Sequence, residues 1–466
     1  MITELFTLQE IAQASGGQWH KKPASLVSIA AVKTDSREDC SNALFIALSG
    51  ENFDAHDFLP KAVAAGAAAL CINRKFAGRL DPAWQIPVLL TDDTLLAYQQ
   101  LGAFHKNRLK GLKTVAVTGS MGKTSVKEII RSILVAAAGP DAVHATVGNT
   151  NNQVGVPQNL LALTAQHKYA VIEMGTNHHG EIEPLSRCTR PDVAVINSIG
   201  PCHLEHLHDL DGVAREKSMI LAHLNPAGTA VIPDVSSGMQ IIEAAAAGFN
   251  TMRFGTTAAA DVRAAYLGGK LHGSALELTF KCLNNQSRRF EWLLSGAHQA
   301  ANAAAGACAA IALGIDPDCI VAGLKNCVLP GMRMKISEKN GVTWINDAYN
   351  ANPGSMLAAL HWLNEFAEQD KLVLVLGDML ELGNASHDEH KKVAAAALKL
   401  FPRAEFFFVG GGMAAALSEL RPVAAVIVCE DSAEAAKKVE SALMPGKMIL
   451  LKGSRGVHLE KVEPQL

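Results

Sequence analysis

The chain has 466 residues, which at about 150 residues per domain predicts three domains and excludes a single small module. Lysine and arginine number 42 and aspartate and glutamate 45, so the net charge of −3 offers no general attraction to polyanions, and no nucleic-acid partner is expected. Hydrophobic residues make up 49% and charged residues 19% of the chain, which excludes a disordered protein. Because only 5% of the residues are aromatic, the composition favours an α/β fold of helix-covered parallel sheets.

Neither a membrane segment nor a disulfide framework is expected. The longest weakly polar stretch, residues 303–315, is shorter than the roughly 20 residues that span a bilayer. Residues 1–17 lack the basic and apolar regions of a secretory signal, so we expect a cytoplasmic protein. The nine cysteines are dispersed without a Cys-x-x-Cys pair, which indicates reduced thiols rather than disulfides or a zinc ribbon.

Residues 1–92 are predicted to form a small α/β domain. Short apolar runs at 43–48, 67–72 and 87–90 are separated by glycine, aspartate and proline, as in a succession of strands and turns. A helix is predicted over residues 94–109 and leads into the next part of the chain.

Residues 93–328 are predicted to form a parallel sheet covered by helices. Strand-like runs at 113–118, 170–174, 193–197 and 229–232 are separated by helical stretches, as in a doubly wound fold.

Residues 329–466 are predicted to form a separate parallel α/β domain. The Pro-Gly pair at 330–331 precedes this block, in which helical patterns alternate with apolar strands. These strands are predicted at 342–345, 372–376, 405–409, 425–429 and 447–451.

A phosphate-binding loop is indicated at the end of the strand 113–118. This strand runs into Gly-Ser-Met-Gly-Lys-Thr-Ser, residues 119–125, and a helix with an apolar face follows. In this context backbone N–H groups close around phosphate oxygens, Lys123 neutralises phosphate charge, and the Thr124 hydroxyl can hold Mg²⁺. Val117 stands where the common eight-residue pattern has its first glycine.

Chemically active side chains follow the next two predicted strands. Glu173 lies at the carboxyl end of the run 170–174, where open parallel sheets place their ligands, and it is either bound to a metal ion or part of a structural ion pair. The spacing of His203, His206 and His208 matches no common zinc motif. A histidine contact to Mg²⁺, or hydrogen-bonded loop histidines, is favoured over zinc. Lys217 by its pattern alone is an ordinary helix-surface lysine.

Several motifs occur in an order that is typical of one family. They are residues 118–124, 172–175, 200–206, 296–298 with Asn302, Arg333, 347–353, 377–383 and 452–455. Together they resemble the Mur ligase family, and the resemblance runs from residue 34 almost to the end of the chain. Two segments, 148–157 and 349–353, are similar to the members of that family that add D-alanyl-D-alanine.

The resemblance implies an N-terminal UDP-sugar-binding domain, a central P-loop ATPase domain and a C-terminal Rossmann-like domain that closes over the site. It implies an ATP-dependent amide ligase of peptidoglycan precursor synthesis, with UDP-N-acetylmuramoyl-tripeptide and D-alanyl-D-alanine as substrates and an acyl phosphate as intermediate. It also implies two Mg²⁺ ions as cofactors. We expect a monomer without membrane insertion, open without ligands and closed with them.

The family motifs also carry site residues over to this chain. For the UDP-sugar and peptide substrate these are Thr34, Asp35, Ser36, Arg37, Phe45, Asn149, Asn151, Asn152, Ser454 and Arg455. For ATP they are Gly119, Ser120, Met121, Gly122, Lys123, Thr124, Ser125, His298, Asn302, Arg333, Asp347, Tyr349 and Asn350. The catalytic residues implied are Lys123, Glu173, His203 and Lys217, and the implied Mg²⁺ ligands are Thr124, Glu173, His203 and a carbamylated Lys217.

Some assignments stay open at the level of sequence. Gln299 stands where the family more often has asparagine, and it receives no role. Asp378 and Glu381 either face the substrate or cap a helix, and no base is assigned to the attacking amine. The alternatives for function are a relative that adds diaminopimelate or lysine, a P-loop kinase or regulatory NTPase, and a non-catalytic nucleotide-binding scaffold.

Overall fold

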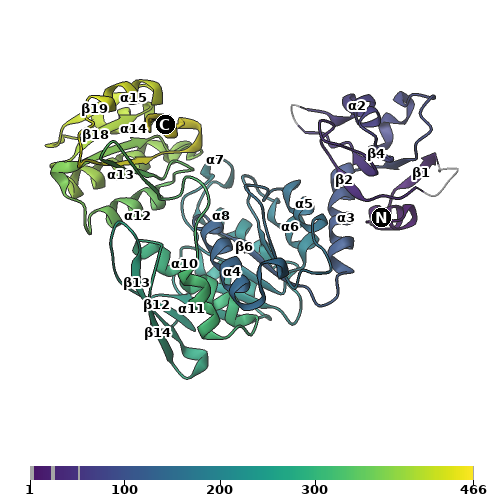
Figure 1. Cartoon of the computed structure of the whole chain (residues 1–466), viewed down its shortest axis with the longest axis horizontal. Coiled ribbons are helices and arrows are strands. Elements are labelled where there is room, and N and C mark those ends of the chain that lie inside the picture. The colour runs from purple at the N-terminus through teal and green to yellow at the C-terminus, as the bar shows by residue number, and fades with distance from the viewer. Residues whose placement is uncertain (1–4, 22–26, 51–52, 465–466) are drawn as a thin grey trace.

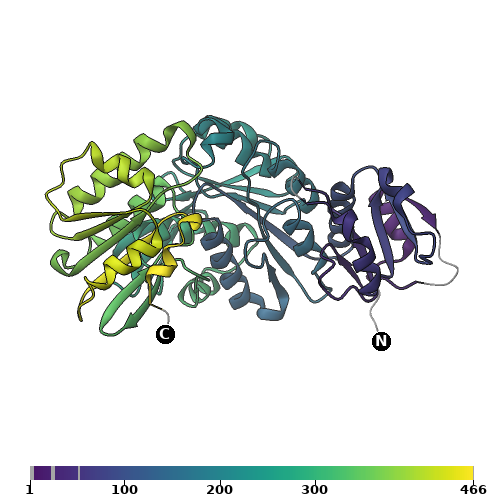
Figure 2. The same cartoon turned by 90° about the horizontal axis from the view of Figure 1, so that it is seen from above.

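The structure is a computed structural model that describes residues 5–21, 27–50 and 53–464. Within these residues the strands form three sheets, which follow one another along the chain. Figure 1 shows the N-terminal and C-terminal sheets at opposite ends of the molecule, with the largest sheet between them. A view turned by 90° shows the same order of the three parts (Figure 2).

The N-terminal sheet has five strands in the order β1-β5-β4-β3-β2. The strands are β1 (Gln18–Lys21), β2 (Ala31–Lys33), β3 (Ala43–Ile46), β4 (Ala69–Asn73) and β5 (Val88–Thr91), and the helices are α1 (Leu8–Ser15), α2 (Leu59–Ala64) and α3 (Thr94–Asn107). Strands β2 to β5 are parallel, whereas β1 pairs with β5 in the antiparallel direction. The predicted strands and the helix that leaves this part are confirmed, the helix ending two residues early.

The central sheet has nine strands in the order β14-β13-β12-β11-β10-β9-β6-β8-β7. They are β6 (Lys113–Thr118), β7 (Val143–Ala145), β8 (Tyr169–Glu173), β9 (Val193–Ile196), β10 (Thr229–Pro233), β11 (Asn250–Gly255), β12 (Val262–Gly269), β13 (Ser274–Phe280) and β14 (Gln286–Trp292). The helices are α4 (Lys123–Ala138), α5 (Gly155–Leu161), α6 (Ile182–Thr189), α7 (Leu204–Leu207), α8 (Leu210–Ser218), α9 (Met239–Ala246), α10 (Ala297–Ala312) and α11 (Pro317–Lys325).

Helices cover both faces of this central sheet. Helices α4, α10 and α11 share one apolar core with it, and α5, α6, α8 and α9 share the other. Strands β6 to β12 pair in parallel, and four of them, β6, β8, β9 and β10, were predicted. Strands β12, β13 and β14 extend the sheet as antiparallel neighbours. The predicted parallel sheet is therefore confirmed over most of its width, and the antiparallel edge was not predicted. Side chains of β13 alternate between buried and partly exposed. This pattern is typical of half-buried antiparallel strands, which contain no continuous apolar run.

The C-terminal sheet has six strands in the order β15-β16-β20-β17-β18-β19. They are β15 (Lys335–Lys339), β16 (Val342–Asn346), β17 (Leu372–Gly377), β18 (Glu405–Val409), β19 (Val426–Cys429) and β20 (Met448–Lys452), and the helices are α12 (Pro353–Leu363), α13 (Ser386–Leu400), α14 (Gly411–Ser418) and α15 (Ser432–Glu440). All pairs are parallel except β15 with β16. Apolar cores lie on both faces, so this part is the predicted Rossmann-like layer structure.

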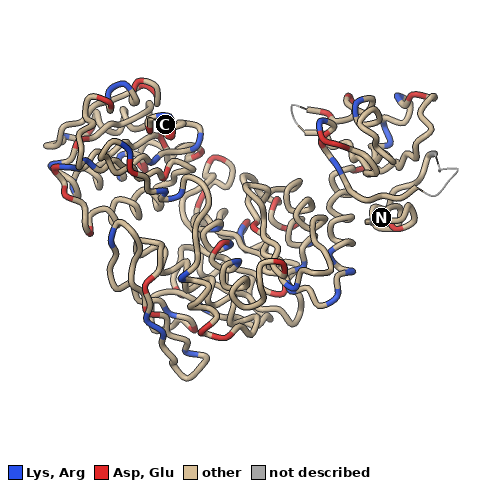
Figure 3. The backbone as a smooth tube through the Cα atoms, in the orientation of Figure 1, with Lys and Arg blue, Asp and Glu red and all other residues tan. Residues whose placement is uncertain are grey.

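Two of these sheets present the carboxyl ends of their strands to the same region. Strands β6, β8 and β9 are adjacent and parallel, so the loops that follow them lie side by side. The same holds for β16, β20 and β17 in the C-terminal part. Charged residues of both signs are interspersed along all three parts (Figure 3). In the described part of the chain, no helix is both long enough and apolar enough to cross a membrane.

Candidate active site

The phosphate-binding loop connects β6 to α4, as predicted. Gly122 precedes the first residue of α4 with a φ of 73°, a left-handed conformation that favours glycine. A Cβ at this position would lie 2.5 Å from both Asn197 Nδ2 and Asn302 Oδ1, so the loop approaches its neighbours too closely for any side chain. Lys123 Nζ donates to the Gly119 carbonyl at 2.8 Å and thereby lies over the loop.

The segment after β9 holds the phosphate-binding loop in place. The Ser198 carbonyl accepts the Ser120 N–H at 2.8 Å, and the Ser198 hydroxyl accepts the Met121 N–H at 3.0 Å. Asn197 Nδ2 donates to the Met121 carbonyl at 2.9 Å. Asn197 and Ser198 received no role from the sequence, although their place directly after a buried strand was a usable signal. They keep the loop preorganised without a ligand.

Glu173 lies at the carboxyl end of β8 and is buried beside the phosphate-binding loop. Its Oε1 accepts hydrogen bonds from the Thr124 hydroxyl at 3.2 Å and from Asn151 Nδ2 at 2.9 Å. Its Oε2 is buried and has no hydrogen-bond partner among the described residues. A buried carboxylate oxygen without a donor is costly, and a cation bound there would remove that cost. The structure therefore fits a metal ligand better than a structural ion pair.

Lys217 lies on α8 with its side chain fully buried, which differs from the surface position that its pattern suggests. Its Nζ has no hydrogen-bond partner within the described residues. Burial is the main cause that lowers the pKa of Lys217 to about 8; the charge of Lys123 acts in the same direction, and Cys202 and Glu216 act in the opposite direction. At neutral pH, the uncharged form of this amine is thus populated far more than in an ordinary lysine.

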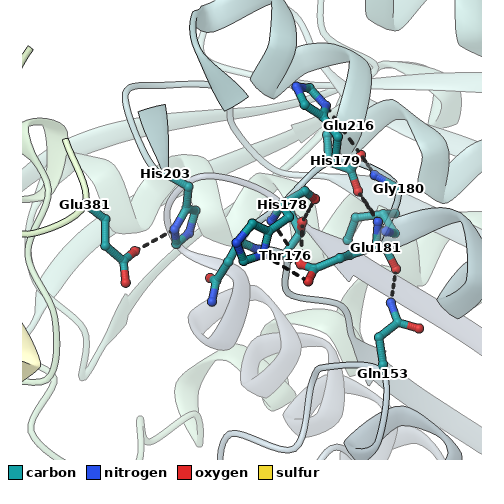
Figure 4. Close-up of polar contacts among 11 residues, drawn as sticks. Gln153, Thr176, His178, His179, Gly180, Glu181, His203, Glu216 and Glu381 are labelled. Atoms are coloured by element: carbon teal, nitrogen blue, oxygen red, sulfur yellow. Dashed lines mark hydrogen bonds and ion pairs between the residues drawn. The ribbon is translucent and has the colours of Figure 1, made fainter. Parts of the chain in front are cut away.

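The neighbouring Glu216 has a different role from Lys217. Its carboxylate accepts the backbone N–H groups of Gly180, Glu181 and Ile182 at 2.7, 3.0 and 2.8 Å, and so caps the start of α6 (Figure 4). These three orphan donors at a helix N-terminus favour a carboxylate. Glu216 therefore fixes the loop between β8 and α6, which lines the site.

His203 follows β9 and faces the C-terminal part of the molecule. Its φ is 51°, and its Nδ1 lies 2.6 Å from Oε2 of Glu381 as an ion pair (Figure 4). The close contact with His203 lowers the pKa of Glu381, with smaller contributions from the charges of His206 and His178, while partial burial opposes the shift. This contact joins loops that are far apart in the sequence.

The other histidines do not assemble a transition-metal site. The His178 and His206 rings lie 4.1 Å apart between centroids, and His179 and His208 lie 6.0 Å apart. In residues 5–21, 27–50 and 53–464, no group of three or more His, Cys, Asp and Glu side chains is arranged to hold a metal ion by itself. The structure gives the zinc alternative no support.

The start of α10 contributes polar groups to the site from a third direction. Asn302 Oδ1 accepts from Asn197 Nδ2 at 2.9 Å, and Asn302 Nδ2 donates to Gln299 Oε1 at 2.9 Å. Gln299, left without a role from sequence, therefore orients Asn302. His298 is partly buried nearby, and desolvation lowers its pKa to about 4, helped by the Lys452 charge and opposed by Asp347.

The C-terminal part reaches the phosphate-binding loop through Arg333. Its Nη2 donates to the Thr124 hydroxyl at 3.1 Å, and its guanidinium stacks 3.7 Å above the centroid of the Tyr349 ring. Asp347 Oδ1 accepts the Met334 N–H at 3.1 Å, and Asp347 Oδ2 pairs with Lys452, a partner that the sequence did not suggest. The Tyr349 ring thus orients the Arg333 guanidinium, and the Asp347 carboxylate fixes the backbone of the next residue, so that Arg333 points toward the central part.

These groups line one cavity of about 990 Å³ between the central and C-terminal parts. Most predicted residues meet there: Ser120, Met121, Gly122, Lys123, Thr124, Ser125, Asn149, Asn151, Asn152, Glu173, His203, His298, Asn302, Arg333, Asp347, Tyr349, Asn350, Ser454 and Arg455. Gly119 and Lys217 are not among the residues that line it. A volume of this size suits a nucleotide with part of a second substrate.

The predicted UDP-binding residues lie apart from this cavity, in the N-terminal part. Thr34 and Ser36 lie in the segment after β2, and the Arg37 guanidinium binds the Asp35 carboxylate, with Nη2–Oδ2 at 2.6 Å and Nε–Oδ1 at 2.9 Å. Phe45 lies in β3 with a fully buried side chain in the apolar core. The structure thus places the Phe45 ring in the core of the sheet rather than on a surface that a nucleotide reaches.

Comparisons with known proteins agree with this geometry. Residues 117–310 match the Mur ligase middle domain, and residues 332–455 match the glutamate ligase domain of Mur ligases. A UDP-N-acetylmuramoyl-tripeptide–D-alanyl-D-alanine ligase of Escherichia coli (strain K12) is 38% identical over 375 residues, which cover 80% of this chain and 79% of the relative. The ligase of the same name from Bacillus subtilis (strain 168) is 34% identical over 469 residues, covering 99% and 98%. A crystal structure of MurF from Acinetobacter baumannii matches with a TM-score of 0.89 and 34% identity over 98% of this chain and 97% of that one.

Proposed function

Because the chain belongs to the Mur ligase family, we propose that it joins D-alanyl-D-alanine to the tripeptide carboxylate of UDP-N-acetylmuramoyl-tripeptide. The products are UDP-N-acetylmuramoyl-pentapeptide, ADP and phosphate, as a step of peptidoglycan precursor synthesis. One observation carries this proposal beyond the similarity to relatives. A single cavity is lined by the phosphate-binding loop, by the buried carboxylate of Glu173 with its unpaired oxygen, and by Arg333 from the C-terminal part.

The reaction needs activation because a carboxylate has no leaving group that an amine can displace. The tripeptide carboxylate attacks the γ-phosphorus of ATP, the bond to ADP breaks, and an acyl phosphate forms. The amine of D-alanyl-D-alanine then attacks the acyl carbon, and phosphate leaves. Lys123, which lies over the loop, and Arg333, which donates to the Thr124 hydroxyl, are placed to neutralise charge that builds on the transferred phosphoryl group.

Mg²⁺ is the cofactor that the donor set fits. A hydroxyl at Thr124, the unpaired carboxylate oxygen of Glu173 and the imidazole of His203 would hold it, with a carbamylated Lys217 as the ligand of a second ion. When bound, Mg²⁺ withdraws negative charge from phosphate oxygens. Few protein ligands are needed, since Mg²⁺ keeps waters and phosphate oxygens in its shell.

Lys217 is proposed to carry a carbamate, formed when its neutral amine attacks CO₂ and releases a proton. Its unpartnered Nζ and a pKa lowered to about 8 support this, because the neutral amine is the form that reacts. Carbamylation would also replace a buried cation by an anion near Lys123.

We expect enzyme equilibrated with ¹³C-labelled bicarbonate to show a carbamate ¹³C resonance that Lys217→Arg abolishes. CO₂-depleted buffer should lower the ligation rate of the wild type at least about tenfold, with recovery on adding bicarbonate. Lys127→Arg is the matched control, because Lys127 is equally buried but donates to Glu128 and to the Thr146 carbonyl. A wild-type enzyme without this resonance would refute the carbamate.

The UDP end of the substrate is proposed to bind the N-terminal part, where Thr34, Ser36 and Arg37 offer hydroxyl and guanidinium donors. Asp35 would orient Arg37 there, and Phe45 would act only as core support.

We propose domain boundaries at 1–92, 93–328 and 329–466, since each sheet falls wholly inside one of these ranges. We also propose that the protein is cytoplasmic and that it acts as a monomer, because one chain lines the cavity by itself.

The proposal is tested by incubating the enzyme with UDP-N-acetylmuramoyl-tripeptide, D-alanyl-D-alanine and Mg²⁺-ATP. Amide formation and ADP release should both require all three substrates, and Lys123→Ala should lower kcat at least about 100-fold. Lys110→Ala, an exposed lysine outside the cavity, is the control. Preference for free diaminopimelate or lysine with a shorter acceptor, or ATP turnover that ignores the UDP-sugar, would contradict the proposal.

A further inference from the structure

The loop that follows β17 is anchored at consecutive residues to different elements. Asp378 accepts the N–H groups of Gly412 and Met413 at 3.0 and 2.8 Å, which caps the start of α14. The Met379 N–H donates to Nε2 of buried His390 at 2.9 Å, and the Leu380 N–H donates to the Ser454 hydroxyl at 2.9 Å. Asp378 therefore has a structural role, which decides one question that the sequence left open. The anchors hold the next residue, Glu381, in a defined place.

Glu381 lies at the apex of this loop and reaches across to the central part. The backbone at Glu381 has a φ of 64°, and that at His203 has a φ of 51°. Residues other than glycine rarely adopt such left-handed conformations. Oε2 of Glu381 lies 2.6 Å from Nδ1 of His203 (Figure 4). The two loops also meet at Gly383, where a Cβ would lie 3.1 Å from the Cα of Glu205. Two uncommon backbone conformations thus face each other where the two parts touch.

The contact leaves one ring nitrogen of His203 available. A carboxylate at Nδ1 favours the tautomer with its proton on that nitrogen and limits rotation of the ring. Among the described residues, Nδ1 of His203 is buried and has no hydrogen-bond partner besides this ion-paired carboxylate, so Nε2 is the ring nitrogen that the contact leaves free. Both His203 and Glu381 line the cavity. Histidines that bind metal ions commonly donate their other N–H to a carboxylate, which orients them.

We propose that Glu381 is a positioning residue for the reaction, which holds His203 with Nε2 free toward the cavity. This inference rests on the proposed function, in which His203 is a metal ligand. Because Glu381 belongs to the C-terminal part and His203 to the central part, the orientation of His203 depends on the approach of the two parts. The competing interpretation is a simple surface ion pair, which contributes little because Glu381 is half-exposed.

The test compares Glu381→Ala, Glu381→Gln and wild type as full-length protein. Glutamine keeps an oxygen that accepts from Nδ1 but lacks the charge. Glu419→Ala is the matched control, since Glu419 pairs with His387 at 2.7 Å in the same part of the chain but outside the cavity. Mn²⁺ affinity is measured by electron paramagnetic resonance with a non-hydrolysable ATP analogue, and the His203 tautomer by ¹⁵N NMR, assigned with His203→Gln.

Glu381→Ala should weaken Mn²⁺ binding about 10- to 100-fold and move the His203 proton from Nδ1 toward Nε2. Glu381→Gln should stay within about threefold of wild type in Mn²⁺ affinity, and Glu419→Ala should be unchanged in both measurements. The proposal is overturned if Glu381→Ala leaves tautomer and affinity unchanged. It is also overturned if Glu381→Gln weakens Mn²⁺ as much as Glu381→Ala, because charge rather than orientation would then be responsible.

The two proposals fail in different ways. A wild type that forms the amide while Glu381→Ala matches it in tautomer and Mn²⁺ affinity overturns only the role of Glu381. A wild type that forms no amide overturns the proposed function, and the NMR comparison still reports on the His203 ring because it requires no turnover.

Discussion

His298 is a histidine that burial keeps neutral. It lies at the first turn of α10 and lines the cavity, and its pKa is lowered to about 4 because its charged form would be desolvated. At neutral pH it therefore offers the cavity an uncharged imidazole, which can donate or accept one hydrogen bond without repelling Lys452.

The desolvated His298 should make stability depend on pH. Its pKa is about 4 in the folded protein against an ordinary value of 6.5, so between these values the unfolded chain binds more protons and acid favours unfolding. From pH 7 to pH 5 this costs about 2 kcal/mol. His298→Gln should therefore lose less thermal stability than wild type over that range, measured as Tm by calorimetry. Exposed His272→Gln is the control; parallel Tm profiles for His298→Gln and wild type would contradict the assignment.

The two carboxylates of the 377–383 motif show what single residues leave undecided in a sequence. Asp378 and Glu381 are equally good candidates for a helix cap or a site residue by pattern. The structure separates them because α14 starts beside Asp378, whereas Glu381 reaches His203. Neither α14 nor His203 is a sequence neighbour, so local pattern had no means of distinguishing the two roles.

At the scale of elements, the helix that follows the phosphate-binding loop is tightly packed against its neighbours. Helix α4 lies against α10 and α11 through glycines, and a Cβ at Gly306 would lie 2.3 Å from Cγ2 of Ile129. At Gly323 on α11 a Cβ would lie 2.3 Å from the Cα of Ile133. Because the second contact is with backbone, only a shift of a whole helix relieves it.

Gly323→Ala should destabilise the protein by about 1–3 kcal/mol through overpacking against α4. The change would appear as a lower Tm in a calorimetric scan of the ligand-free protein. Gly78→Ala is the matched control, since no atom lies within 4 Å of a Cβ built there. A Tm for Gly323→Ala equal to that of Gly78→Ala would show that α4 and α11 are less tightly packed than described.

At the scale of the whole molecule, the cavity exists only where two parts of the chain meet. Arg333 reaches Thr124, Glu381 reaches His203, and the Tyr266 hydroxyl donates to Glu365 at 2.5 Å across the same division. Polar contacts of this kind allow relative motion of the parts. Assembly of the site by closure would also exclude water, which would otherwise hydrolyse an acyl phosphate.

We expect the molecule to be more open without ligands than with an ATP analogue and the UDP-sugar substrate. Small-angle X-ray scattering should show a smaller radius of gyration with both ligands, and Arg333→Ala should reduce this change because the contact with Thr124 is lost. The control is D-alanyl-D-alanine alone, which should leave the scattering curve as it is. Identical curves with and without the nucleotide and UDP-sugar would exclude closure as the means of assembling the site.

The amino-acid sequence by itself determined the features that depend only on residues close together in the chain. Buried strands appear as apolar runs, and the glycine-rich loop before an amphipathic helix specifies a phosphate site, so β6, α4 and the position of Glu173 were predictable. Strands β12–β14 were missed because partly or fully exposed positions interrupt their buried residues and leave no apolar run. Only the tertiary structure decided which distant groups meet: Asp347 with Lys452, Asn197 with the phosphate-binding loop, and Glu381 with His203. Such pairs are set by the order of strands and the packing of separate parts, which no local spacing of residues encodes.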